Sequence, residues 1–214
     1  MSSSDSMASD RWAKVERSAV GVADYGIAGA VRIYYRIYLP VGTAFLTAVG
    51  ALLAIPVFGL SPDDWPTYVG FGMSIAAAGI LVGGLVYARK RLNPLVRPHR
   101  QSALIWLDRS ERKSVRDQIF GKVPPVGHQL SVLRGIAVQI RQALAMQLLL
   151  APGFVLLCAN QMLLAISRKG FLGFLWFWIP LVMLFLTVFA TALWQFRRTE
   201  QFLDRTSISE APEV

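Results

Sequence analysis

The sequence predicts an all-α polytopic membrane protein with four transmembrane helices, arranged in two antiparallel hairpins with a helical cytoplasmic segment between them. Three observations support this fold class. Of the 214 residues, 54% are hydrophobic and only 16% are charged, the mean hydropathy is +0.46, and the apolar residues form long uncharged blocks. A soluble protein would instead distribute its apolar residues at the period of helices or strands.

The predicted transmembrane helices are four apolar runs at residues 37–60, 67–88, 143–167 and 171–195. A helix of about 22 to 25 residues is roughly 33–37 Å long, which is enough to cross a hydrocarbon core of ~30 Å. The runs contain no Asp, Glu, Lys, Arg or His. Short polar links at 61–66 and 167–170 join them in pairs, so each pair is expected to form a tight hairpin.

The basic residues predict which way the hairpins face. Two hairpins place residues 1–36, 89–142 and 196–214 on one side of the membrane, and these segments hold 20 of the 22 Lys and Arg residues. Since basic residues favour the cytoplasmic side, both termini are predicted to be cytoplasmic in a multi-pass protein of the plasma membrane. The expected organisation is an N-terminal segment 1–36 with an amphipathic helix, hairpins at 37–88 and 143–195, the segment 89–142 between them, and a C-terminal tail 196–214.

The cytoplasmic parts contain signals for helices. Asp108 and Glu111 are spaced like a capping box, and Gly121 followed by Pro124 and Pro125 ends the helix that the box would open. A second amphipathic helix is expected to begin near residue 129 and to continue into the third apolar run. The stretch 10–36 is expected to form a helix in the membrane interface.

Segment 89–142 can account for the whole net charge of +9. Anionic lipid headgroups are the first expected partner of this segment, because a cluster of basic residues directly follows the second apolar run. A protein partner contacting Ile105, Trp106 and Leu107 is the second alternative. Nucleic acid is not expected, since no recognition motif accompanies the charge. The residues expected to contact headgroups are Arg89, Lys90, Arg91, Arg97 and Arg100.

Small residues in the second apolar run predict close helix packing, because small side chains let helices approach in a bilayer. They form two rows at four-residue spacing: Gly70, Ser74 and Ala78 on one, Gly79 and Gly83 on the other. A contact within the monomer is favoured over dimerisation. Pro56, Pro152 and Pro180 lie inside apolar runs and are expected to shape the bundle.

No catalytic, cofactor-binding or metal-ligating residues are predicted. His99 and His128 have no nucleophile motif near them, and the single cysteine, Cys158, lies in an apolar run. Asn160 and Gln161 are the candidates for a polar intramembrane contact. They suit a hydrogen bond between helices better than a ligand site.

The function expected from these features is that of a non-enzymatic accessory or scaffold subunit of a larger membrane assembly, with a membrane protein partner or a second copy of the chain beside it. A small oligomeric transporter or channel is the alternative, with Asn160 and Gln161 near its path. A lipid-modifying membrane enzyme ranks third.

Overall fold

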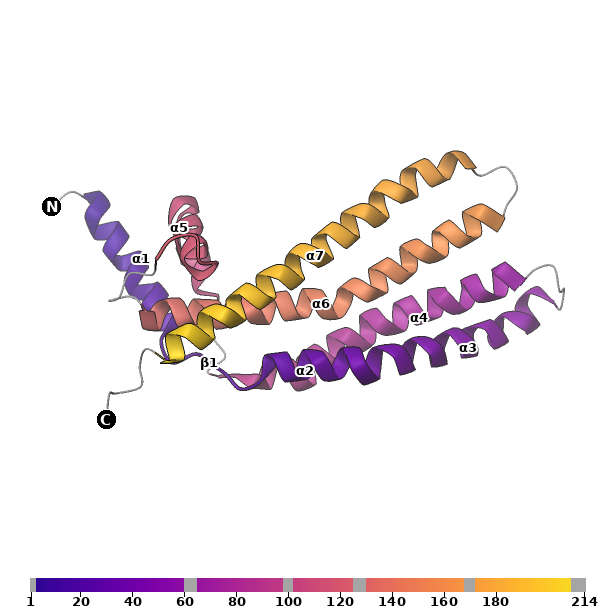
Figure 1. Ribbon diagram of the computed structural model, residues 1–214, viewed down its shortest axis with the longest axis horizontal. Helices are drawn as coiled ribbons and strands as arrows, with labels where there is room; N and C mark the ends of the chain where they lie inside the picture. Colours follow the sequence, from indigo (N-terminus) through magenta and orange to yellow (C-terminus); the bar gives the residue numbers. More distant parts are fainter. Residues whose placement is uncertain (1–2, 60–64, 98–101, 125–129, 168–171, 209–214) are drawn as a thin grey trace. The chain divides into compact units, whose positions relative to one another are not determined.

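The computed structural model describes residues 3–59, 65–97, 102–124, 130–167 and 172–208. These residues are almost wholly helical (Figure 1), and four of the helical stretches are long and apolar enough to cross a membrane. The predicted all-α class with four candidate membrane-spanning helices is therefore confirmed. These stretches are Ile27–Phe58, Trp65–Leu95, Leu130–Leu164 and Trp176–Thr206.

The helices extend beyond the uncharged runs that predicted them. The first stretch joins α2 (Ile27–Ile33), a π-helical turn (Tyr34–Tyr38) and α3 (Leu39–Phe58). The second joins α4 (Trp65–Tyr87) to a π-helical turn (Ala88–Leu92) and a 3-10 turn (Asn93–Leu95). Helices α6 (Leu130–Ser167) and α7 (Leu172–Ile208) have 38 and 37 residues. A helix of that length is roughly 55 Å long, so it exceeds the ~30 Å hydrocarbon core.

The N-terminal stretch does not form the continuous helix that was expected over 10–36. Helix α1 (Ser3–Ala19) ends before Gly21, and α2 begins only at Ile27. Gly21 and Gly26 adopt φ values of 81° and 109°, a left-handed conformation that interrupts a helix and that glycine adopts without steric cost. Between them, β1 (Ala23–Asp24) pairs antiparallel with β2 (Val96–Arg97). The prediction of one helix was wrong because Gly21 and Gly26, both with positive φ, separate α1 from α2.

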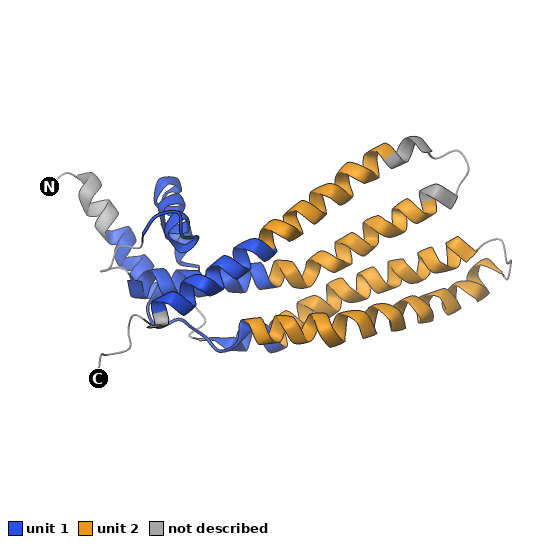
Figure 2. Ribbon diagram, in the orientation of Figure 1, with its two compact units in different colours: residues 1–27, 91–145, 193–214 blue, residues 28–90, 146–192 orange. Residues whose placement is uncertain are grey.

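The described residues divide into two compact units (Figure 2): unit 1 contains residues 1–27, 91–145 and 193–214, and unit 2 contains residues 28–90 and 146–192. Unit 1 has a hydrophobic core to which all three of its segments contribute. The most buried members are Val15, Ala19, Ala103, Leu107, Val115, Ile119, Leu133, Ile136 and Ala137, with Phe202 from α7.

Helix α5 (Arg109–Ile119) in unit 1 begins and ends as the sequence predicts. Asp108 and Glu111 form the capping box, in which the Glu111 carboxylate accepts a hydrogen bond from the Asp108 backbone N–H at 2.8 Å. Gly121, with φ of 75°, follows the end of the helix. Val115 and Ile119 face the core, so the basic residues of α5 lie on its outer side. The predicted second helix is also confirmed, since α6 begins at Leu130 and continues without a break into the third apolar run.

Unit 2 is held together by close helix contacts. Helix α3 packs along α4, where a Cβ on Gly50 would lie 2.7 Å from the Cα of Gly72, and a Cβ on Gly72 would collide with the Thr47 carbonyl. Helices α4 and α6 meet at Gly153, where a Cβ would lie 2.8 Å from Leu81. Only glycine permits such backbone proximity in a bilayer, where close packing replaces apolar burial as the source of helix association.

A tyrosine hydroxyl satisfies the backbone group that Pro152 leaves without a donor. Proline has no N–H, so the carbonyl four residues earlier, that of Leu148, loses its helical hydrogen bond. The Tyr35 hydroxyl donates to this carbonyl at 2.6 Å, and the neighbouring Tyr34 hydroxyl donates to the Leu149 carbonyl at 3.2 Å. The two bonds connect the π-helical turn before α3 to the middle of α6.

Candidate functional site

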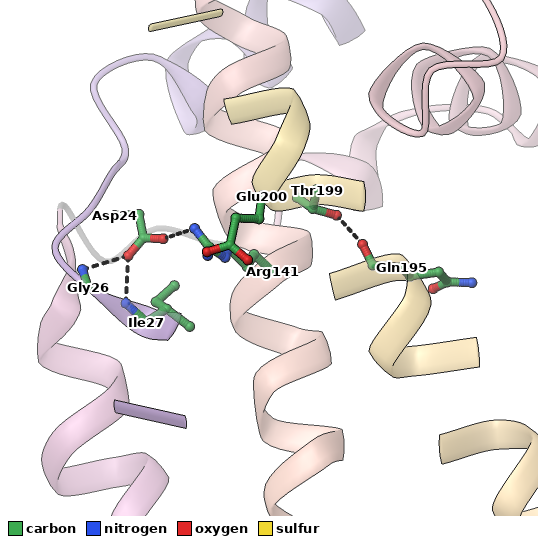
Figure 3. A network of polar contacts seen from close by, with 7 residues as sticks. All are labelled: Asp24, Gly26, Ile27, Arg141, Gln195, Thr199 and Glu200. Atoms are coloured by element: carbon green, nitrogen blue, oxygen red, sulfur yellow. Dashed lines mark hydrogen bonds and ion pairs between the residues drawn. The ribbon is translucent and has the colours of Figure 1, made fainter. Parts of the chain in front are cut away.

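The most elaborate polar site among the described residues surrounds Arg141 in unit 1 (Figure 3). Arg141 lies on α6 and is only 6% exposed. Its Nη1 donates to Asp24 Oδ2 at 2.6 Å, and its Nη2 lies 2.8 Å from Glu200 Oε1 on α7. The guanidinium also lies over the ring of Phe196, 5.0 Å from its centroid. One side chain therefore connects the N-terminal segment, α6 and α7.

Asp24 is held by the backbone as well as by Arg141. Its Oδ1 accepts hydrogen bonds from the N–H groups of Gly26 and Ile27, both at 2.8 Å. These donors precede and begin α2, so the carboxylate caps the start of that helix. The Asp24 side chain is 11% exposed, while that of Glu200 is 39% exposed. The Arg141–Asp24 pair is thus the buried part of the network, and Glu200 forms its solvent edge.

A cavity of about 450 Å³ adjoins this network. Its charged lining comes from Arg134, Arg141, Asp24 and Asp204, so positive and negative groups are balanced. Because Arg141 and Asp24 already bond to each other, the arrangement is suited to joining three chain segments. Groups of three or more side chains able to hold a metal ion are not found among the described residues.

Comparison with protein-family models, curated proteins and solved structures found no match.

Asn160, one of the two candidate intramembrane residues, lies between helices of unit 2. It is fully buried, and its Nδ2 donates to the Ser74 hydroxyl at 2.7 Å. Ser74 in turn donates to the Gly70 carbonyl at 3.0 Å. This chain of bonds connects α6 to α4, which is the interhelical role expected for a lone amide in a bilayer. Gln161 is partly exposed.

The other small residues of α4 have different surroundings. A Cβ on Gly70 would lie 2.8 Å from Leu164 of α6, and a Cβ on Gly79 would collide with Leu46 of α3. Gly83 has no such neighbour within 4 Å, and Ala78 is exposed. The first row therefore contacts α6 at Gly70 and through the Ser74–Asn160 bond. The second row contacts α3 at Gly79.

The residues expected to contact lipid headgroups fall into two groups. Arg89, Lys90 and Arg91 lie on the π-helical turn after α4 and are exposed. Arg97 belongs to β2, but its side chain is not described, and Arg100 lies outside the described residues.

Of the three residues expected to meet a protein partner, Ile105 and Trp106 are 62% and 37% exposed, whereas Leu107 is in the core.

Sequence reasoning missed Arg141, Asp24 and Glu200. One signal was available for Arg141, which follows Leu133 and Ala137 at four-residue spacing and so lies on the buried face of α6. A single charge on an apolar helix face implies a buried partner. Asp24 and Glu200 carry no comparable local signal, because they are distant in sequence from Arg141.

Proposed function

We propose that the protein is a non-enzymatic accessory or scaffold subunit of a larger membrane assembly. In this proposal the four apolar helices cross the plasma membrane as two hairpins, with both termini and segment 89–142 in the cytoplasm. The expected neighbour is a membrane protein partner or a second copy of this chain.

The observation that carries the proposal is the construction of unit 1. Its core combines residues of α1, α5, α6 and α7, and the buried Arg141 of α6 forms ion pairs with Asp24 of β1 and Glu200 of α7. A protein whose buried polar groups serve its own packing is suited to presenting a stable surface to other proteins. The apolar helices α3 and α7 support the same role, since few of their described side chains are buried within the chain and the others are available to lipid or partner helices.

Copurification from native membranes in mild detergent tests the scaffold role. The tagged full-length chain should recover the same partner at a fixed stoichiometry, and tagging that partner should recover this chain in return. Asn160→Leu should leave this recovery unchanged, because the Asn160 side chain is fully buried and does not reach a partner. Isolation of the chain alone, without a stoichiometric partner or a second copy, would contradict the proposal.

A small oligomeric transporter or channel is the second candidate, and one observation favours it. The Oδ1 atom of Asn160 is buried and accepts no hydrogen bond within the described residues; it lies against Gly70, so a polar solute that separated these two residues would find an unused acceptor. Flux through proteoliposomes containing the purified chain tests this candidate. A flux that falls in the Asn160→Leu, Gln161→Leu variant and persists in Ser74→Ala would support it, whereas absence of flux would remove it.

A further inference from the structure

A basic cleft in unit 1 is distinct from the Arg141 network. It is a cavity of about 570 Å³ whose lining includes Arg109, Arg112, Lys113, Arg116, Lys122 and Trp194. Four of these residues lie on α5, one follows it, and Trp194 lies on α7. We refer to this cavity below as the basic cleft.

The cations of the basic cleft are placed there by the amphipathic character of α5. Since Val115 and Ile119 are buried in the core, Arg109, Lys113 and Arg116 remain exposed. Arg112 is also fixed in orientation, because its Nε donates to the Leu107 carbonyl at 2.7 Å and its Nη2 to the Ile105 carbonyl at 3.3 Å. A guanidinium that is already oriented loses less conformational freedom when it binds an anion.

The net charge of the basic cleft is positive. Asp117 is the acidic residue in its lining, and this carboxylate already forms an ion pair with Lys122 at 3.0 Å. Among the described residues of the lining, no further acidic side chain is present to neutralise the remaining four basic residues. Arginine and lysine clustered in this way are suited to a phosphate group, which offers several strong acceptor oxygens.

Trp194 places the basic cleft at the level where α7 changes from apolar to charged. Residues 171–195 contain no charge, and Arg197 and Arg198 follow directly. Trp194 is 48% exposed, its ring lies 6.2 Å from that of Phe120, and Arg198 lies over it at 5.4 Å. A half-exposed tryptophan beside arginines at the end of an apolar helix is typical of the membrane–water interface.

We propose that the basic cleft binds the phosphate of an anionic membrane lipid whose acyl chains lie in the bilayer. A soluble phosphate compound would use the same cations but would gain nothing from the bilayer. The proposal is independent of the scaffold role, because it requires only that the apolar part of α7 lies in a bilayer. It also differs from the headgroup contacts expected at residues 89–100, which lie on another part of the chain.

Native mass spectrometry of the detergent-solubilised full chain tests the proposal, with phosphatidylglycerol, phosphatidylcholine and inorganic phosphate as probes. The cleft variant is Arg109→Gln, Lys113→Gln and Arg116→Gln, which keeps Arg112 and its backbone bonds. The matched control is Lys14→Gln, Arg17→Gln and Arg32→Gln, which removes the same charge from exposed positions outside the lining of the basic cleft. Circular dichroism and gel filtration check that both variants fold.

Each cation near an anionic headgroup contributes roughly fivefold to binding. With three cations removed, the cleft variant should therefore lose affinity for phosphatidylglycerol by roughly a hundredfold, while the control loses less than about threefold. Phosphatidylcholine should bind weakly to all three proteins. Equal losses in both variants, or no loss in the cleft variant, would overturn the site. Displacement of phosphatidylglycerol by inorganic phosphate at an equal concentration would overturn the assignment to lipid.

Discussion

At the scale of single residues, buried polar groups in this protein bond to partners that are distant in sequence. Arg141 pairs with Asp24, 117 positions away, and Asn160 bonds to Ser74, 86 positions away. Burying such groups costs several kcal/mol unless they are paired. Substituting one member of such a pair is therefore expected to destabilise the protein, because the other member stays buried without its partner.

The Arg141 network makes a prediction that separates its buried part from its exposed part. Arg141→Gln leaves the Asp24 carboxylate buried without a counter-charge, so the variant should be destabilised by about 3–5 kcal/mol. Glu200→Gln removes a partner that is 39% exposed, and should cost no more than about 1 kcal/mol. Thermal unfolding of both variants in the same detergent measures the difference, and equal losses would contradict this account of the network.

The Tyr35 hydroxyl and Pro152 are expected to act as a pair. Tyr35→Phe leaves the Leu148 carbonyl without a donor and should destabilise the protein by about 1 kcal/mol. In a Pro152→Ala background the alanine N–H restores the helical bond, so the same substitution should have almost no effect. A double-mutant cycle of thermal stability measures this coupling. Tyr38→Phe is the control, because Tyr38 is half exposed and its ring contact with Tyr87 does not need the hydroxyl.

At the scale of helices, the sequence predicts elements better than it predicts their contacts. Run length and the absence of charge are properties of a contiguous stretch, so the four apolar helices, the capping box of α5 and the unbroken α6 were all predictable. The small-residue rows of α4 also predicted that this helix is suited to close packing. Which glycine meets which neighbour depends on helix rotation and register, and these are set by contacts between distant segments.

Gly72 and Gly83 provide a matched test of helix packing within α4. A Cβ on Gly72 would collide with the Thr47 backbone carbonyl of α3, whereas a Cβ on Gly83 would have no heavy atom from another part of the chain within 4 Å. Gly72→Ala should therefore destabilise the protein by about 1–3 kcal/mol, because a backbone atom cannot move aside as a flexible side chain can. Gly83→Ala should be neutral or slightly stabilising, since alanine favours the helix. Equal thermal stability of the two variants would contradict the packing of α3 on α4.

The functional candidates were less accessible to sequence reasoning than the helices. Asn160 was identified because an amide in an uncharged run is conspicuous. Arg141 was missed because arginine is common in the basic segment 89–142, and its burial follows from the helical register of α6. The basic cleft was missed for a related reason: its cations were counted within segment 89–142, but Trp194, which adjoins them, lies in α7.

At the scale of the whole molecule, charge asymmetry predicts the orientation. Twenty of the 22 basic residues lie in segments that two hairpins would place on one side, and transferring that side across the membrane is unfavourable. Position 63, between the first two apolar helices, is therefore expected outside the cell, and position 113 on α5 inside it. The basic cleft would then face the cytoplasmic leaflet, whose surface is negative.

Single cysteines test this orientation directly. Cys158 is the only native cysteine and is 4% exposed, so Cys158→Ala provides a background in which introduced thiols can be labelled. In intact cells a membrane-impermeant maleimide should label Asp63→Cys, and should label Lys113→Cys only after permeabilisation. Labelling of position 113 alone in intact cells would invert the topology. Labelling of both positions in intact cells would show that the second apolar helix, Trp65–Leu95, does not place them on opposite sides of the membrane.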